Sequence, residues 1–170
     1  MRHNWNNITM IGMPASGKST VGVLLAKRIG YQFIDSDILI QNQEKRLLKE
    51  IIAQDGLEGF LAIEEQVNRG IQADRAVIAP GGSVIYGKTA MEHLKEIGTV
   101  VYLKISYEDL EKRLGNLVDR GVALKDGMTL RDLYDERTEL YEKYADVTID
   151  ETGKTSGKVV DELRAMVEWG

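Results

Sequence analysis

The sequence predicts an α/β fold built on one parallel β-sheet, and three observations support this. Short apolar runs alternate with helix-length segments along the 170 residues, as in a series of βαβ units. A glycine-rich stretch joins the first apolar run to the first helical segment. Carboxylates follow the second apolar run, and open parallel sheets bind ligands where their strands end. The length suits one hydrophobic core, so we expect a single domain over residues 1–170.

The apolar runs mark the expected strands, and the periodicity between them marks the expected helices. Strands are expected at residues 8–11, 32–34, 77–79, 99–104 and 147–149. The first helix follows the glycine-rich stretch, shows apolar residues at helical spacing and ends at Gly30. A later helix is expected over residues 58–72. A last helix, over residues 155–169, is expected to cover one edge of the sheet.

The glycine-rich stretch, residues 12–19, matches the phosphate-binding pattern G-x-x-x-x-G-K-[ST]. Its glycines permit the backbone angles at which successive N–H groups point at an anion. Lys18 is expected to reach the β- and γ-phosphates of ATP, and Ser19 to hold Mg²⁺. The nucleotide-binding residues are therefore expected to be Gly12, Pro14, Ala15, Ser16, Gly17, Lys18, Ser19 and Thr20.

Residues 82–89 satisfy the same pattern, but their chemistry argues against a second phosphate loop. The interior of this match is Val84, Ile85 and Tyr86, and such side chains resist positive φ angles. We interpret the match as a coincidence in which Lys88 or Thr89 opens a helix. A third fragment at residues 153–155 lacks the upstream glycine of the pattern.

Asp35 and Asp37 come directly after the second expected strand. One carboxylate at this edge could order Mg²⁺ through water, while the other receives the proton of an attacking hydroxyl. Alternatively, Asp35 or Ser36 only caps the helix that follows.

Two charged residues fall on apolar helix faces. Glu64 lies between Phe60 and Val67 on one face, and a buried carboxylate needs a partner. It belongs either to a structural ion pair or to a site. Arg137 occupies a position in the apolar stripe of a helix that starts near Thr129, so it should point inward. An inward guanidinium needs an anion, and we favour a ligand over a side-chain carboxylate.

The loop at about residues 115–128 is long and has glycines near both of its ends. A loop of this length in a compact domain is typical of a lid, and Arg120 could swing onto a transferring phosphate. A solvated loop without a function is the alternative.

Composition excludes several classes of function. The net charge of −5 gives no basic footprint for nucleic acid or an anionic membrane. The chain has no cysteine, which excludes disulfides, thiolate metal sites and a cysteine nucleophile. No apolar run approaches transmembrane length. We expect a cytoplasmic protein, a monomer or weak homodimer, with no nucleic-acid or membrane partner.

Over nearly its whole length the chain resembles the shikimate kinase family, a branch of the nucleoside-monophosphate-kinase-like P-loop proteins. The residues that carry the resemblance are the phosphate loop, residues 33–37, Gly56 with Phe60 and Glu64, residues 80–82, Arg120, and Arg137 with Tyr141. The resemblance implies a three-layer P-loop kinase fold with a five-stranded parallel sheet in the order 2-3-1-4-5. Helices would cover both faces, with acceptor-binding helices at about residues 37–72 and a lid.

The resemblance also implies roles for individual residues. Lys18, Asp37 and Arg120 would be catalytic, and Asp35 would assist Ser19 in holding Mg²⁺. The acceptor, a small molecule with a hydroxyl group, would contact Asp37, Leu61, Glu64, Gly81, Gly82 and Arg137.

The acceptor region departs from the family pattern. Leu61 stands where the family has the arginine that shares the shikimate carboxylate with Arg137. Leu57 replaces a glutamate, and Ser83 replaces a third glycine. We therefore expect an ATP-dependent small-molecule kinase whose acceptor is not shikimate.

Two alternative functions stay open. The first is shikimate kinase itself, with a displaced cation such as Arg69 or Arg46 compensating for Leu61. The second is a nucleotide-dependent regulatory protein. Residues 116–119 lack the lysine of a guanine-reading motif, and the expected catalytic residues are all present, which argues against this second class.

Overall fold

The computed structural model describes residues 2–114 and 125–169, and its five strands form a parallel sheet. The strand order is β2-β3-β1-β4-β5, as the sequence predicted. The strands are β1 (Asn7–Ile11), β2 (Gln32–Asp35), β3 (Ala76–Ala79), β4 (Thr99–Lys104) and β5 (Val147–Asp150). Each expected strand lies within an observed one. β1 is central, with Ile8 paired to Val77 of β3 on one side and to Thr99 of β4 on the other.

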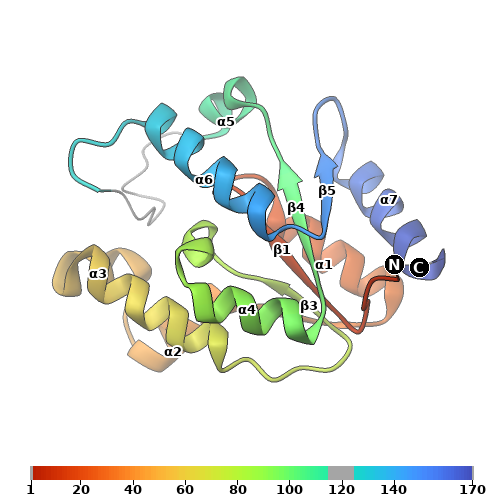
Figure 1. Cartoon of the computed structure of the whole chain (residues 1–170), viewed down its shortest axis with the longest axis horizontal. Helices are drawn as coiled ribbons and strands as arrows, with labels where there is room; N and C mark the ends of the chain where they lie inside the picture. The colour runs from red at the N-terminus through yellow and green to blue at the C-terminus, as the bar shows by residue number, and fades with distance from the viewer. Residues whose placement is uncertain (1, 115–124, 170) are drawn as a thin grey trace.

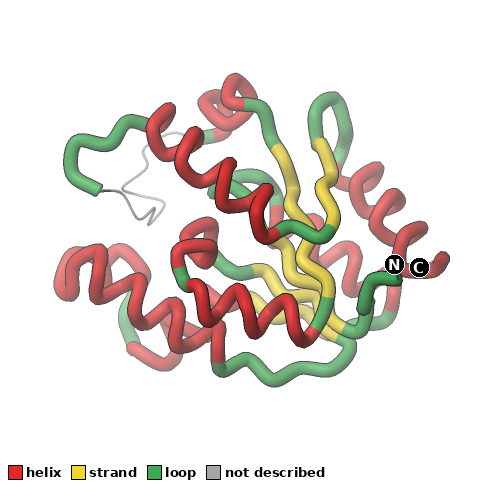
Figure 2. Tube along the Cα trace, viewed as in Figure 1, coloured by secondary structure: helices red, strands yellow, loops and turns green. Residues whose placement is uncertain are grey.

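Helices lie on both sides of the sheet (Figure 2). They are α1 (Lys18–Ile29), α2 (Ser36–Glu44), α3 (Leu48–Arg69), the 3₁₀ helix η1 (Gly82–Tyr86), α4 (Lys88–Ile97), α5 (Tyr107–Arg113), α6 (Leu130–Tyr144) and α7 (Ser156–Trp169). No helix within residues 2–114 and 125–169 is both long and apolar enough to cross a lipid bilayer.

Alternating strand residues build a separate hydrophobic cluster on each face of the sheet. Ile78 and Tyr102 face the cluster that contains residues of η1, α4, α5 and α6. Val77 and Val101 face the opposite cluster, which contains residues of α1 and α7. Figure 1 shows α1 and α7 together on one side of the strands. The last helix therefore covers a face of the sheet beside α1 rather than its edge, which corrects the expectation from the sequence.

The helix predicted over residues 58–72 begins earlier, at Leu48, and is kinked. Gly56 interrupts α3 with φ 77° and ψ 175°, which are not helical angles. Both parts of α3 contribute to a third cluster with α2, which contains Ile40, Ile51 and Phe60. α3 ends at Arg69, and Ile71 is buried just beyond it.

Because the strands are parallel, the segments that leave their carboxyl ends gather at one edge of the sheet. The loop after β1 carries the glycine-rich pattern, α2 follows β2 directly, and residues 80–82 follow β3. α6 packs against η1 at the same edge. This edge therefore brings together most of the residues that the sequence predicted for a site.

Candidate active site

The loop between β1 and α1 has the backbone geometry of a phosphate cradle. Gly12, Ala15 and Gly17 have φ angles of 154°, 64° and 89°. Positive φ is strained for alanine, so the surrounding fold must hold Ala15 in this conformation. A Cβ atom at Gly12 would lie 2.8 Å from the carbonyl oxygen of Leu103, which explains that glycine. Gly17 opens α1 without a side-chain cap, so the N–H groups of the first turn are left to donate hydrogen bonds to an anion.

Lys18 lies buried beneath this loop, with 9% of its surface exposed. Its Nζ donates hydrogen bonds to the carbonyl oxygens of Gly12 at 2.8 Å and Met13 at 2.9 Å. Burial lowers the pKa of Lys18 to about 8, and the nearby carboxylate of Asp37 opposes that shift. Ser16 Oγ is also buried, and no described residue hydrogen-bonds to it. Lys18 is thus held beneath the loop by two backbone carbonyls, and the hydroxyl of Ser16 has no partner among the described residues, which suits a loop that receives phosphate oxygens.

The second match to the phosphate pattern has a different conformation. Residues 82–89 are all described, and none of them has a positive φ angle. The segment forms η1 and then the start of α4 at Lys88. Lys88 is exposed, and its Nζ lies 3.9 Å from Glu92. The expectation that a helix opens at Lys88 is confirmed, and the conformation of this segment is not that of a phosphate cradle. Lys154 of the third fragment pairs with Glu162 at 2.9 Å.

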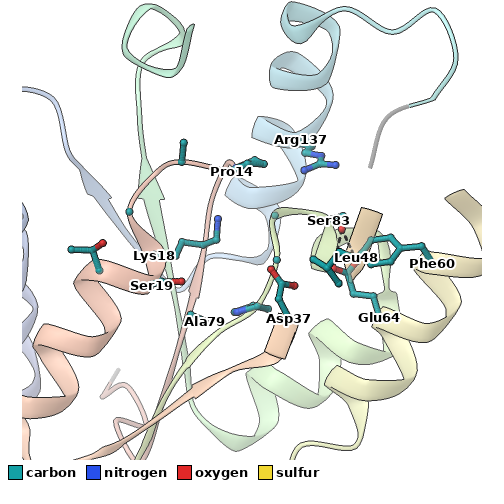
Figure 3. A pocket seen from close by; sticks show the side chains of 16 residues that line it. Pro14, Lys18, Ser19, Asp37, Leu48, Phe60, Glu64, Ala79, Ser83 and Arg137 are labelled. Carbon is teal, nitrogen blue, oxygen red and sulfur yellow. Dashed lines mark hydrogen bonds between the residues drawn. The ribbon is translucent and has the colours of Figure 1, made fainter. Parts of the chain in front are cut away.

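A cavity of about 380 Å³ lies beside the loop and extends toward α3 and α6. It is lined by Pro14, Ala15, Gly17, Lys18, Ser19, Thr20, Asp37, Leu48, Phe60, Glu64, Ala79, Pro80, Gly81, Gly82, Ser83 and Arg137. In Figure 3 the side chains of Lys18, Asp37, Glu64 and Arg137 surround this one space. Gly12, Ser16, Asp35 and Leu61 were also predicted for the site and are not among the lining residues. Arg120 lies outside the described residues.

Asp35 and Asp37 have different environments although they are two residues apart. Asp35 Oδ1 accepts hydrogen bonds from the backbone N–H groups of Asp37 at 3.0 Å and Ile38 at 3.3 Å. Asp35 is therefore the N-cap of α2, as the alternative interpretation predicted. Asp37 Oδ1 is buried, and no described residue hydrogen-bonds to it. Burial, and next the charge of Asp35, raise the pKa of Asp37 to about 6, against the effect of Lys18.

Glu64 is a buried carboxylate at the far side of the cavity, with 2% of its surface exposed. Ser83 Oγ donates to both of its oxygens, at 2.7 and 2.9 Å. Burial raises the pKa of Glu64 to about 7, while the hydrogen bond from Ser83 acts in the opposite direction. Ser83 is a departure from the family pattern that the sequence shows, but its contact with Glu64 could not be predicted from the sequence.

Gly81 and Gly82 allow three charged groups to approach the backbone closely. A Cβ atom at Gly81 would lie 2.9 Å from Asp37 Oδ1 and 3.1 Å from Glu64 Oε2. A Cβ atom at Gly82 would lie 3.0 Å from Arg137 Nη1. Distances this short exclude larger residues at both positions unless the charged side chains move. The absence of side chains at Gly81 and Gly82 therefore allows Asp37, Glu64 and Arg137 to lie close to the backbone at this point of the cavity.

Arg137 is buried within α6, with 1% of its surface exposed, so its predicted inward orientation is confirmed. Its guanidinium lies 5.4 Å from the centre of the Tyr86 ring, which is a favourable cation–π distance. Tyr141 Oη donates to the carbonyl oxygen of Gly82 at 2.6 Å and so ties α6 to η1. The inward position of Arg137 could be predicted from helical spacing, whereas the tyrosine at position 86 that packs against it was missed.

Leu61 faces a second, smaller cavity of about 30 Å³. Its lining consists of Leu57, Leu61, Tyr86, Lys125, Met128 and Glu136. Arg46 and Arg69, the cations that could have compensated for the missing arginine at position 61, do not line the large cavity. Arg46 pairs with Glu44 and Asp55 at 2.9 and 2.8 Å, and Arg69 is exposed at the end of α3.

A family model described as shikimate kinase matches residues 14–168. A shikimate kinase from Moorella thermoacetica is 37% identical over 167 residues, which cover 96% of this chain and 95% of the relative. One from Clostridium botulinum is 42% identical over 142 residues, which cover 81% and 83%. The structure of an Acinetobacter baumannii shikimate kinase in complex with shikimate superposes with a TM-score of 0.87 at 29% identity, covering 96% of this chain and 93% of that one.

Proposed function

The chain belongs to the shikimate kinase family, and from this premise we propose that it phosphorylates a small acceptor other than shikimate. As a member of the family it is an ATP-dependent phosphotransferase that acts on a hydroxyl group. Because the chain belongs to a kinase family, the alternative function of a nucleotide-dependent regulatory protein has no support. One observation carries the proposal. Arg137 is the one arginine among the described residues that line the large cavity, and the leucine at position 61 faces an apolar cavity instead.

We place the triphosphate of ATP on Gly12, Pro14, Ala15, Ser16, Gly17, Lys18, Ser19 and Thr20. The positive φ angles of the loop and the uncapped first turn of α1 support this placement. Ser19 is exposed at the cavity, and Ser19 and Asp35 are the proposed Mg²⁺ ligands. No cluster of three or more acidic, histidine or cysteine residues exists among residues 2–114 and 125–169. Such a sparse donor set fits Mg²⁺, which takes most of its ligands from phosphate and water and would neutralise phosphate charge.

Asp37 is the proposed acceptor of the hydroxyl proton. Its Oδ1 is buried at the cavity without a partner among the described residues, and Lys18 is close enough to affect its pKa. The acceptor oxygen forms a bond to the γ-phosphorus, and the bond between that phosphorus and the leaving ADP oxygen breaks. Asp37 takes the proton released from the hydroxyl. Gly81 and Gly82 allow the acceptor to approach the backbone, Arg137 binds its anionic group, and Arg120 is proposed to stabilise the transferring phosphoryl group.

The exchange of an arginine for Leu61 has an energetic consequence for acceptor choice. A charge-assisted bidentate contact with a carboxylate contributes about 1.5–3 kcal/mol, and a leucine side chain cannot replace it. An acceptor with one small or weak anionic group needs only Arg137. An apolar part of the acceptor would find matching surface near Leu57 and Leu61.

Shikimate itself is the second candidate acceptor, because one cation lies near position 61. Lys125 lines the small cavity together with Leu61, and its Nζ is 3.5 Å from Glu136. If Lys125 left Glu136, its charge could supply part of what the missing arginine supplies. The names of the relatives from Moorella thermoacetica and Clostridium botulinum favour this candidate as well.

A comparison of acceptors tests the proposal. ADP release is measured with shikimate and with a panel of polyols, hydroxy acids and amino alcohols, for the wild type, Leu61→Arg and the matched apolar control Leu61→Met. We expect poor turnover of shikimate by the wild type and by the control. Leu61→Arg should shift kcat/KM toward carboxylated polyols by up to about thirtyfold, equivalent to about 2 kcal/mol. Efficient shikimate turnover by the wild type would overturn the proposal in favour of the second candidate.

A further inference from the structure

Glu64 is a buried carboxylate of the cavity, and none of the cations of residues 2–114 and 125–169 pairs with it at short range. Among the described residues, no lysine, arginine or histidine nitrogen lies within ion-pair distance of the Glu64 carboxylate. Its hydrogen bonds come from the neutral hydroxyl of Ser83. A buried carboxylate without a cation is costly, so its position at a ligand cavity points to a cation in the ligand.

The departures from the family pattern explain how this charge arises. Positions 61 and 64 are three residues apart on α3 and therefore neighbours on the same helix face. The leucine at position 61 offers Glu64 no positive charge, whereas an arginine at that position could form an ion pair with Glu64. Ser83, at a position where the family has glycine, supplies a hydroxyl to Glu64 instead. The two substitutions together remove a cation from the acceptor side of the cavity and keep the carboxylate of Glu64 in place.

Lys18 and Arg137 act on the Glu64 carboxylate electrostatically, but neither lies within ion-pair distance of it. Lys18, from α1, is near Asp37 and acts on its pKa, so the charge of Asp37 is opposed by a protein cation. Asp37 and Glu64 converge on Gly81, whereas Arg137 approaches the adjacent Gly82. Neighbouring Cα atoms are about 3.8 Å apart, so the cation of α6 and the carboxylate of α3 both lie close to the same short stretch of backbone. Opposite charges in this arrangement match a molecule that carries a carboxylate and an ammonium group close together.

We propose that the acceptor is a hydroxy-amine, most simply a hydroxy-amino acid, whose ammonium group binds Glu64 while its carboxylate binds Arg137. The inference rests on the proposed function, because it concerns the acceptor of the same cavity. An ammonium donates up to three hydrogen bonds, and those to a buried carboxylate are charge-assisted. The remaining hydroxyl of the acceptor lies toward Asp37 and Lys18, where the phosphoryl group arrives. Glu64 is then a specificity-determining residue of the transfer reaction.

Matched acceptor pairs test the inference. Serine is compared with glycerate, and homoserine with 2,4-dihydroxybutyrate, because the members of each pair differ in an amine against a hydroxyl. Binding to the ADP–Mg²⁺ complex and kcat/KM for ADP release are measured, with shikimate as a further arm. We expect the amine member of at least one pair to be preferred by about tenfold or more. Glu64→Gln should abolish that preference by weakening binding and turnover of the amine member of the pair. The control Glu58→Gln changes an exposed glutamate of the same helix and should leave the preference unchanged.

A second measurement needs no variant that could fail to fold. Glu64 faces Lys18 of α1, Asp37 of α2 and Arg137 of α6, and its pKa is raised to about 7. Acidification from pH 8 to pH 6 should therefore weaken binding of the amine member more than binding of its hydroxyl partner. Equal binding within both pairs, or an amine preference that survives Glu64→Gln or acidification, overturns the inference. Preference for hydroxy acids overturns the inference alone, whereas efficient turnover of shikimate overturns the proposed function.

Discussion

At the scale of the residue, burial converts ordinary side chains into reactive or selective ones. Lys18 keeps two carbonyl partners beneath its loop, and burial lowers its pKa to about 8. Arg137, Glu64 and the Oδ1 atom of Asp37 are likewise withdrawn from bulk water around one cavity. Periodicity in the sequence could predict that Glu64 and Arg137 point inward. It could not predict Ser83 or Tyr86 as their neighbours, because these contacts join residues that only the tertiary fold brings together.

The two lysines that follow a glycine in phosphate-loop patterns should behave differently. Lys18→Ala should abolish nucleotide binding or turnover, because Lys18 lies under a loop with positive φ angles at the cavity. Lys88→Ala removes an exposed ion pair and should change binding and stability by less than about 1 kcal/mol. Titration of each variant with ATP–Mg²⁺ checks this, and equal losses in the two variants would mean that the loop assignment is wrong.

At the scale of the element, the positions of strands and helices followed from sequence patterns, but the shape of α3 did not. Strand positions could be read from apolar runs because each strand is short and flanked by polar residues. The start of α3 was missed because Gly56 lies in the middle of the helix and resembles a boundary in the sequence. The kink matters for the site, since Leu57, Phe60, Leu61 and Glu64 all follow it.

The kink can be tested with a pair of glycine substitutions in and next to the same helix. Gly56 has φ 77° and ψ 175°, a region essentially restricted to glycine, although a Cβ atom there would meet no neighbour within 4 Å. Gly56→Ala should therefore destabilise the protein by about 1–3 kcal/mol through backbone strain alone. The control Gly70→Ala has φ −86° and should be nearly neutral. Denaturant unfolding measures both, and equal stabilities of the two variants would contradict the strained kink.

At the scale of the whole molecule, the parallel sheet places three segments from distant parts of the sequence at one edge. The strand order could be predicted because the resemblance to a kinase family covers nearly the whole chain. This arrangement buries several carboxyl groups near the carboxyl ends of the strands. Asp37 and Glu64 line the large cavity, and Glu151 lies beside Gly17 of the phosphate loop. Burial raises the pKa values of these three carboxyl groups to about 6, 7 and 7. A folded state that raises the pKa of a carboxyl group binds protons more tightly than the unfolded state does.

This linkage predicts how the stability of the ligand-free protein depends on pH. The contribution of each of these carboxyl groups is fully present below its unfolded pKa, near 4, and is lost as pH rises through its folded pKa. Asp55, Asp132 and Asp150 have lowered pKa values, so their effect falls below about pH 4, outside this window. Lys18 stays protonated in both states below its folded pKa of about 8. We expect the free energy of unfolding to fall by several kcal/mol between pH 5 and pH 7.5. Glu64→Gln should flatten this fall and Glu58→Gln should not, and a wild-type stability that rises with pH across the same window would contradict the buried charges described for the cavity.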